Sequence, residues 1–287
     1  MSSQSAFDPQ DLYTKFLPDF ANPDNRSGGR GGFCFETCVF FLHILRALGF
    51  KAYPTSARIR IRDHFTRVPS GPFVGPRHVV NLVILQDGSI WSCDVGFGGD
   101  GPTSPLALSV TPEQEPEVVP NLGSQDVRLR RGVFPETVRE DANLVWFYEY
   151  RNGKDSAWNT YYAFGESEAS DWDLQCANFW VVSHPDSFQR KQILSVKFIK
   201  GDDVEGNGVA CIKGGELNGG TLPGEVTVVG KIMLADDVVK RNMGGKTETV
   251  RHCRTEMERI EALKEYFGIY LTDEEQHGIK GFETELK

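Results

Sequence analysis

An apolar segment that runs from Phe35 to Leu48 has to be accommodated in any fold of this chain. Its large side chains recur at helical spacing, and nearly every face of the resulting helix carries one of them. Such a helix needs neighbouring elements to cover it, so we expect it to be buried. Gly49 follows directly and is suited to ending the helix. The chain must therefore build a core around this segment.

The residues that follow this helix indicate a β-rich middle region, because short runs of β-branched and aromatic residues recur there. In chain order the runs read KAYPTSARIRI, HVVNLVIL, SIWSCDVGF, LVWFYEY, TYYAF, FWVVS and ILSVKFI. Two stretches rich in Pro, Gly and acidic residues, 103–127 and 201–208, are predicted to be long loops. A late strand at GEVTVVGKIML and a short amphipathic helix at TEMERIEALKEYF complete the pattern.

Composition is that of an ordinary soluble globular protein and argues against several functions. The 287 residues include 31 Lys and Arg and 40 Asp and Glu, a formal net charge of −9, which disfavours general binding to nucleic acid or to anionic membranes. The first residues lack the apolar run of a signal peptide, and no apolar stretch is long enough for a membrane span. The 6 cysteines are scattered, as is typical of reduced thiols. We therefore expect a cytoplasmic location.

Cys34 is the first candidate for chemistry, because the glycine-rich segment SGGRGGF leads to it just where the helix is predicted to begin. Unpaired amide N–H groups and the helix dipole favour a thiolate at this position. The glycines also leave room for a substrate to reach the sulfur. A buried structural thiol is the alternative interpretation, and a base close to the sulfur would decide between the two.

The segment RHVVNLVILQDGSIWSCDVGFGG supplies such a base, because it is predicted to be a hairpin with His78 in the first strand and Asp94 near the end of the second. A two-residue loop at Asp87-Gly88 would place the two side chains on opposite faces. A three-residue loop, with Gly88 in the left-handed region, places them on the same face as diagonal neighbours. There the carboxylate can orient the imidazole that accepts a thiol proton. An ordinary hairpin with a polar end is the alternative.

Two other motifs are weaker. Cys34, Cys38 and His43 suggest zinc, but no second close pair completes a tetrahedral set, so we expect no metal. The segment GFGGDG, residues 96–101, matches the glycine spacing of a dinucleotide fingerprint. Prolines follow it in place of a helix, and Asn121 stands where an acidic residue is required. What remains is a backbone-rich loop beside Asp94 that can closely approach a thioester or a pyrophosphate.

Taken together, RGGFCFE, a histidine at the start of a strand and DVGFG resemble the arylamine N-acetyltransferases. LYTKF, NFWVVSHPDSFQ and YFGIYL extend the resemblance over most of the chain. The resemblance implies a Cys-His-Asp triad, arranged as in papain, on Cys34, His78 and Asp94. It also implies an α+β fold in three regions: a helical bundle with the cysteine (1–50), a β-barrel (51–176) and an α/β lid (177–287).

The resemblance further implies ping-pong transfer of an acetyl or similar short acyl group from acetyl-CoA, through a cysteine thioester, to an aromatic amine or hydrazine. This chemistry belongs to the metabolism of foreign compounds and needs no metal. We expect substrate contacts from Phe33, Phe97, Gly96 and Gly98, although core packing is an equal alternative for the two phenylalanines.

Other features of the motif region bear on stability. Arg30 and Glu36 are predicted to form an ion pair that braces the cysteine turn. The family usually carries a longer helical segment before the cysteine, with a PFEN-like stretch, so we expect part of the first bundle to be absent. In place of the usual ELN, the chain has Glu36-Thr37-Cys38.

Two other functions stay open at this point. A Cys-His-Asp set serves amide chemistry equally well, as in a cysteine hydrolase or a transglutaminase. A catalytically inactive, truncated family member is the other alternative. Release of thiol from acetyl-CoA that depends on an aromatic amine would separate these readings.

Overall fold

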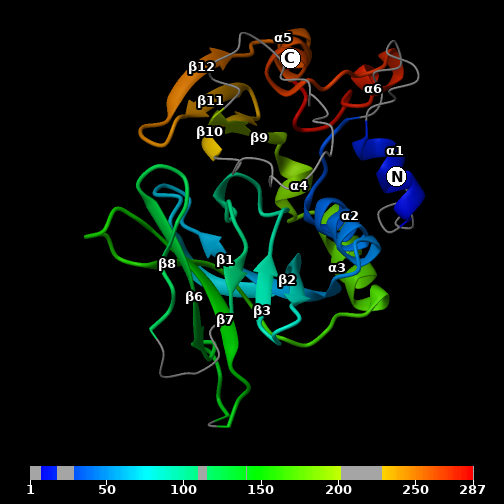
Figure 1. The fold of residues 1–287 in the computed structure, drawn as a ribbon. Coiled ribbons are helices and arrows are strands. Elements are labelled where there is room, and N and C mark those ends of the chain that lie inside the picture. The colour runs from blue at the N-terminus through cyan, green and yellow to red at the C-terminus, as the bar shows by residue number, and fades with distance from the viewer. Residues whose placement is uncertain (1–7, 18–28, 109–114, 140, 202–227, 287) are drawn as a thin grey trace, which may run out of the picture.

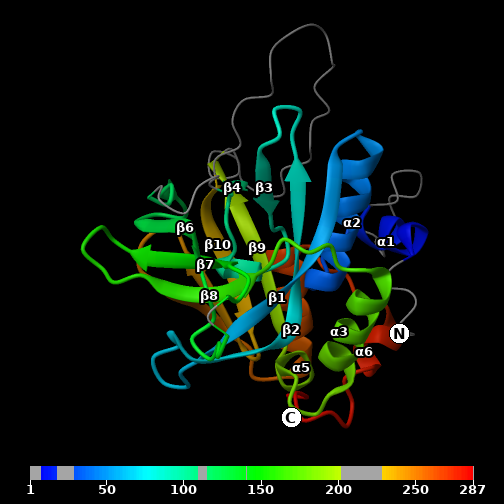
Figure 2. The same cartoon turned by 90° about the horizontal axis from the view of Figure 1, so that it is seen from below.

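The computed structural model describes residues 8–17, 29–108, 115–139, 141–201 and 228–286. Figure 1 shows a large curved sheet, a smaller sheet with α5 and α6 beside it, and α1, α2 and α3 on one side. Seen from below, α2 and α3 lie next to β1 and β2, and α1 lies on the outer side of α2 (Figure 2).

The predicted apolar helix is α2, which spans Cys34–Ala47 and begins one residue earlier than the apolar pattern. It ends in a Schellman turn: the N–H of Phe50 donates to Leu45 and that of Gly49 to Arg46, both at 3.0 Å. Gly49 has the positive φ of +88° that this turn requires.

The expectation that α2 is buried nearly all round is only half right. Phe35, Cys38 and Val39 are buried, whereas Ile44 is 39% and Leu48 70% exposed. The covered face packs against β1 and β2 and contacts α1 (Pro9–Phe16). One stripe of apolar residues is thus enough to fix the helix in place.

The middle region forms one antiparallel sheet with the strand order β4-β3-β2-β1-β8-β7-β6-β5. Its strands are β1 (Lys51–Arg62), β2 (Pro69–Ile84), β3 (Ile90–Cys93), β4 (Leu106–Ala107), β5 (Val119–Pro120), β6 (Gln125–Gly132), β7 (Val145–Asn152) and β8 (Asn159–Phe164). Strands β4 and β6 contact each other although they are not neighbours in the order, so the sheet curls into a nearly closed barrel. The expected β-rich middle is confirmed.

The interior of this barrel is strongly aromatic. Tyr148 and Tyr162 stack with ring centroids 4.8 Å apart, and both are almost fully buried. Their neighbours in the same core are Val80, Leu82, Leu129, Trp146, Tyr150, Tyr161 and Phe164. The barrel therefore has a packed aromatic core. His78 lies at the edge of this core, with its ring centroid 5.2 Å from that of Tyr162.

Two predictions for this region are wrong. Residues 103–127 are not one long loop, because β4, β5 and the start of β6 lie within them. FWVVS, residues 179–183, is not a strand but the end of α3, Asp171–Ser183. The Ser170 side chain accepts from the N–H of Asp173, whose carboxylate accepts from the N–H of Ser170, and this capping box starts the helix. The side chains that α3 buries are Leu174, Asn178 and Val181.

The C-terminal part contains a second antiparallel sheet with the order β12-β11-β10-β9. Its strands are β9 (Leu194–Lys200), β10 (Val228–Ala235), β11 (Val238–Asn242) and β12 (Glu248–His252), and its helices are α4 (Phe188–Lys191), α5 (Glu256–Ala262), the π-helical turn η4 (Leu263–Phe267) and α6 (Asp273–His277). The strands predicted at ILSVKFI and within GEVTVVGKIML correspond to β9 and β10. The loop predicted at 201–208 lies almost entirely outside the described residues.

The small sheet and its helices share a core of Ile232, Leu234, Val239, Cys253 and Ala262. The three-region division at 50 and 176 stays a prediction, and its second boundary falls inside α3. Among the described residues, no helix has the length and apolar character needed to cross a membrane.

Candidate active site

The hairpin of β2 and β3 has the three-residue loop on which the site depends. Asn81 pairs with Cys93 and Ile84 with Ile90, so paired residue numbers sum to 174. Gly88 has a φ of +85°, and the loop consists of residues 86–88. The predicted register is confirmed, and it turns His78 and Asp94 towards each other.

His78 and Asp94 form a buried, hydrogen-bonded pair. The Nε2 atom of His78 lies 2.7 Å from Oδ2 of Asp94. His78 is 1% and Asp94 6% exposed. In such a place a carboxylate fixes the orientation of the imidazole and stabilises its protonated form.

Further donors hold the Asp94 carboxylate. The phenol of Tyr162 donates to Oδ2 at 2.8 Å. On Oδ1, the N–H of Gly96 donates at 2.9 Å and that of Phe97 at 3.2 Å, and the thiol of Cys38 donates at 3.8 Å. Neither the Tyr162 contact nor the Cys38 contact is predictable from the sequence, since both depend on tertiary packing. The carboxylate therefore has one defined position.

The charges of the pair follow from these contacts. Burial disfavours the imidazolium, but the Asp94 carboxylate and the Cys34 side chain more than offset it, so the pKa of His78 rises to about 10. Burial likewise opposes the charge of Asp94, yet His78 and the N–H of Gly96 hold its pKa below the ordinary value. At neutral pH the pair is an ion pair.

Cys34 occupies the first position of α2, beside the imidazole. Its side chain is one of the groups that raise the pKa of His78, and its Sγ atom lies 3.8 Å from the carbonyl oxygen of Arg77, the residue before His78. Because Asp94 engages Nε2 of His78, Nδ1 is the ring nitrogen left for a second partner. The β1–β2 register shifts beside His78, where Arg77 has no partner, and such bulges commonly re-aim side chains next to active sites. Cys34, His78 and Asp94 thus form a series of neighbouring side chains, with the imidazole between the sulfur and the carboxylate.

Two nearby thiols have a different environment. Burial and the charge of Asp94 raise the pKa of Cys38 well above its ordinary value. The same two causes raise the pKa of Cys93 to about 11. Both side chains therefore stay protonated at neutral pH and are poor nucleophiles.

The four residues expected to contact substrate lie around this series. Phe97 packs edge-on against His78 at 5.1 Å and against Tyr162 at 4.8 Å. Phe33 is partly buried among the residues of α2 and α3. Gly98 has a φ of +72° and starts the short turn η2, Gly98–Asp100.

Gly96 is a point of close approach between the loop and α2. A Cβ atom there would lie 2.7 Å from Sγ of Cys38 and 2.8 Å from Cα of Cys34. Real Cβ atoms do not come so close, so only glycine lets the loop meet the helix at this point. The glycine thereby sets the distance between the Asp94 loop and the Cys34 turn.

The predicted ion pair of Arg30 with Glu36 is wrong. Glu36 binds Lys15 at 2.6 Å and accepts from the N–H of Phe33 at 3.2 Å. Arg30 instead forms an ion pair with Glu275 on α6. Sequence proximity favoured the local partner, whereas the folded chain brings a distant carboxylate to Arg30.

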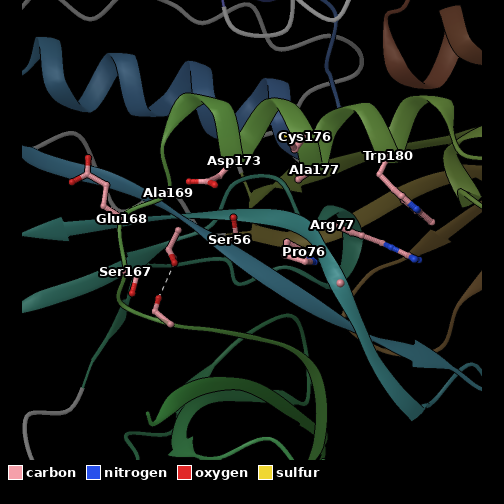
Figure 3. A pocket seen from close by; sticks show the side chains of 13 residues that line it. Ser56, Pro76, Arg77, Ser167, Glu168, Ala169, Asp173, Cys176, Ala177 and Trp180 are labelled. Carbon is pink, nitrogen blue, oxygen red and sulfur yellow. Dashed lines mark hydrogen bonds between the residues drawn. The ribbon is translucent and has the colours of Figure 1, made fainter. Parts of the chain in front are cut away.

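A groove of about 590 Å³ lies between α3 and strands β1 and β2. Figure 3 shows Asp173, Cys176 and Trp180 on its α3 side and Arg77 on β2. The Arg77 guanidinium stacks on the Trp180 ring at 3.3 Å. None of the three residues of the series lines this groove. Within the described residues, no group of three or more His, Cys, Asp or Glu side chains is arranged to hold a metal ion.

Comparison with known proteins identifies the family of the chain. A family model described as N-acetyltransferase matches residues 27–204, which include the cysteine turn, the barrel and α3. The chain belongs to the arylamine N-acetyltransferase family. The resemblance seen in the sequence motifs is confirmed.

Relatives within this family differ in the activity that their names state. An N-malonyltransferase of Fusarium pseudograminearum is 26% identical over 283 residues, which cover 95% of this chain and 72% of that protein. An arylamine N-acetyltransferase / N-hydroxyarylamine O-acetyltransferase of Salmonella typhimurium is 28% identical over 171 residues, 59% of this chain and 52% of that protein.

Solved structures show the same fold. The arylamine N-acetyltransferase of Salmonella typhimurium matches with a TM-score of 0.64 and 22% identity, over 97% of this chain and 78% of that one. The enzyme of Mycobacterium marinum in complex with CoA matches with a TM-score of 0.63 and 20% identity, over 92% and 75% of the two chains.

Proposed function

We propose that the chain transfers an acyl group from coenzyme A to an aromatic amine or hydrazine in two steps, through a thioester on Cys34. The observation that carries this proposal is the 2.7 Å contact of His78 with Asp94 next to the Cys34 thiol. Nucleophile, base and orienting carboxylate are the three parts that covalent acyl transfer requires. Family membership supports the reaction class, and the neighbour in complex with CoA supports the donor.

The first step loads the enzyme. His78 holds the proton of the pair, and the Cys34 thiolate attacks the carbonyl carbon of the acyl thioester. The negative oxygen that develops is stabilised by backbone N–H groups at the first turn of α2. When the carbon–sulfur bond to coenzyme A breaks, His78 gives its proton to the leaving thiolate, and the acyl group remains on Cys34.

The second step unloads it. The nitrogen of the amine attacks the Cys34 thioester, and His78 takes a proton from that nitrogen. The bond between carbon and the Cys34 sulfur then breaks, which forms the amide and restores the thiolate–imidazolium pair. Phe97, Phe33, Gly96 and Gly98 are the proposed contacts for the acceptor and the acyl group.

The acyl group has two candidates. Acetyl follows from the family, whereas malonyl is favoured by a specific observation: the relative named as an N-malonyltransferase aligns over 95% of this chain, and the Salmonella acetyltransferase over 59%. We therefore place malonyl-CoA beside acetyl-CoA as a donor to be tested.

The location proposed for this activity is the cytoplasm. The five described cysteines are all free, which fits a reducing compartment. Cys211 lies outside the described residues.

Mass spectrometry of the chain mixed with acetyl-CoA or malonyl-CoA tests the proposal. One acyl group should appear on Cys34, vanish in Cys34→Ala, and persist in the matched control Cys93→Ala. Addition of an aromatic amine should then remove the label and yield the amide. A label on Cys38 or Cys93 would refute the assignment of the nucleophile. Continued release of thiol without an amine, beyond the one equivalent released on loading, would favour a hydrolase.

A further inference from the structure

Arg30 lies four residues before Cys34, yet its side chain binds the C-terminal segment. Nη2 donates to Oε2 of Glu275 at 2.8 Å, and Nη1 binds Oε1 of the same carboxylate. Nη2 also donates to the carbonyl of Tyr270 at 2.8 Å. A two-point contact of this kind fixes orientation as well as distance. One side chain therefore joins segments that are 245 residues apart in sequence.

Glu275 is itself held in place. Its Oε2 accepts from the N–H of Thr272 at 2.8 Å, and its own N–H donates to Oγ1 of Thr272 at 3.3 Å, the capping box of α6. The hydrogen bond from Arg30 lowers the pKa of Glu275 to about 2. Both groups of the pair therefore stay charged over the whole range of ordinary pH.

The link between Arg30 and Cys34 consists of Gly31, Gly32 and Phe33. Glycine has the most backbone freedom to lose on ordering, so this link needs an anchor. The N–H of Arg30 donates to the carbonyl of Lys15 at 3.1 Å, and its guanidinium is bound to α6. Arg30 thus attaches the beginning of this link to α1 and α6, while Phe33 is held at its other end by Glu36.

We propose that Arg30 is a positioning residue for Cys34, acting through Glu275, so that the C-terminal segment sets the reactivity of the thiol. The inference rests on the proposed function, because Arg30 touches none of the reacting atoms. Without the pair, the glycine link samples more conformations, and the sulfur is less often in reach of the His78 ring. The loss falls on the rate of acylation rather than on substrate affinity.

The test compares Arg30→Gln, Glu275→Gln, the double variant and the exchanged pair Arg30→Glu/Glu275→Arg. Two rates are measured: alkylation of Cys34 by iodoacetamide across a pH series, and acylation by the donor that labels the parent chain. We expect each single variant to lower both rates about tenfold, with KM unchanged, and the double variant to be no slower than either single one. The exchanged pair should recover part of the loss.

Arg251→Gln supplies the matched control, since Arg251 donates to Glu261 at 2.9 Å within the same C-terminal part. It should leave both rates unchanged. Thermal melting checks that each variant is folded. Arg30→Lys keeps the positive charge but cannot form the two-point contact, and it replaces any variant that does not fold.

Parent-like alkylation in folded Glu275→Gln would overturn the proposal, as would losses that add in the double variant. The alkylation measurement needs no acyl donor. A parent chain that is alkylated but never acylated would therefore contradict the proposed function alone, and leave the role of Arg30 still measurable.

Discussion

Asp94 is the residue on which the contacts of the site converge. The imidazole of His78, the phenol of Tyr162, two backbone N–H groups and the Cys38 thiol all point at its two oxygens. A carboxylate this well solvated by the protein keeps its charge in a buried place. Tyr162, one of these donors, belongs to the aromatic core of the barrel. That core therefore helps to hold Asp94, and through it the candidate base His78.

Replacing Tyr162 by Phe tests how much the hydrogen bond from the Tyr162 hydroxyl contributes to stability and to acylation. The variant keeps the ring and removes the hydroxyl that donates to Asp94 at 2.8 Å. We expect a loss of about 1–2 kcal/mol of unfolding free energy and a drop of about tenfold in the acylation rate. Urea denaturation and the acylation assay measure the two effects.

Tyr148→Phe is the control, because its hydroxyl donates to the carbonyl of Asp100 in the same core and does not touch Asp94. It should cost similar stability with little effect on acylation. Equal losses of rate in both variants would mean that the barrel, and not the Asp94 contact, is responsible.

The charge of His78 predicts how stability depends on pH. In the folded chain its pKa is about 10, against an ordinary value of about 6.5 in the unfolded chain. Its stabilising effect is therefore complete below about pH 6.5 and is lost as the pH rises towards about 10. The lowered pKa of Asp94 acts at the other end, where stability is lost as the pH falls below about 4.

The measurement is the difference in unfolding free energy between the parent and His78→Gln, from urea denaturation at about pH 6 and about pH 9. We expect the difference to shrink at the higher pH. Subtracting the unfolding free energy of one chain from that of the other cancels the effect of titratable groups that both chains contain. A difference that stays constant, or grows, would show that His78 is neutral in the folded state.

At the scale of elements, the site depends on how closely the Asp94 loop approaches α2. Gly96→Ala would place a Cβ atom 2.7 Å from Sγ of Cys38, and the loop and the helix must then separate. We expect a loss of about 1–3 kcal/mol in stability, together with slower alkylation of Cys34 by iodoacetamide. Gly75→Ala is the matched control, since open space surrounds its Cβ position. If Gly96→Ala were as stable and as reactive as Gly75→Ala, the close contact of the Asp94 loop with α2 would not be needed for the site.

How far the sequence predicted these elements depended on how local their determinants are. The hairpin register was predictable because the loop and the parity of His78 and Asp94 lie within one short segment. The strand predicted at FWVVS is wrong because a short apolar run does not distinguish a strand from a buried helix. The capping box that decides for the helix begins at Ser170, outside that run. The contact of Tyr162 with Asp94 could not be predicted, since it joins residues that are 68 positions apart in the sequence.

At the scale of the whole molecule, ion pairs join the C-terminal part to both segments of the site. Lys231 on β10 and Arg62 on β1 share the Asp100 carboxylate at 3.3 and 2.8 Å, next to the Asp94 loop. Arg30 and Glu275 do the same for the Cys34 turn. Partner choice at such separations is set by the folded chain, which is why Glu36 was the wrong partner to expect for Arg30.

The Arg30–Glu275 contact has a further consequence for the order in which the protein is made. A chain leaves the ribosome N-terminus first, and domains generally begin to fold in that order. The β2–β3 hairpin can pair as soon as its own residues have emerged, whereas closing a loop of 245 residues must wait for Glu275 and carries a larger entropy cost. A nascent chain therefore holds its cysteine, histidine and aspartate long before the cysteine turn is anchored. On the proposal made for Arg30, the thiol reaches its full reactivity only after Glu275 has emerged and bound Arg30.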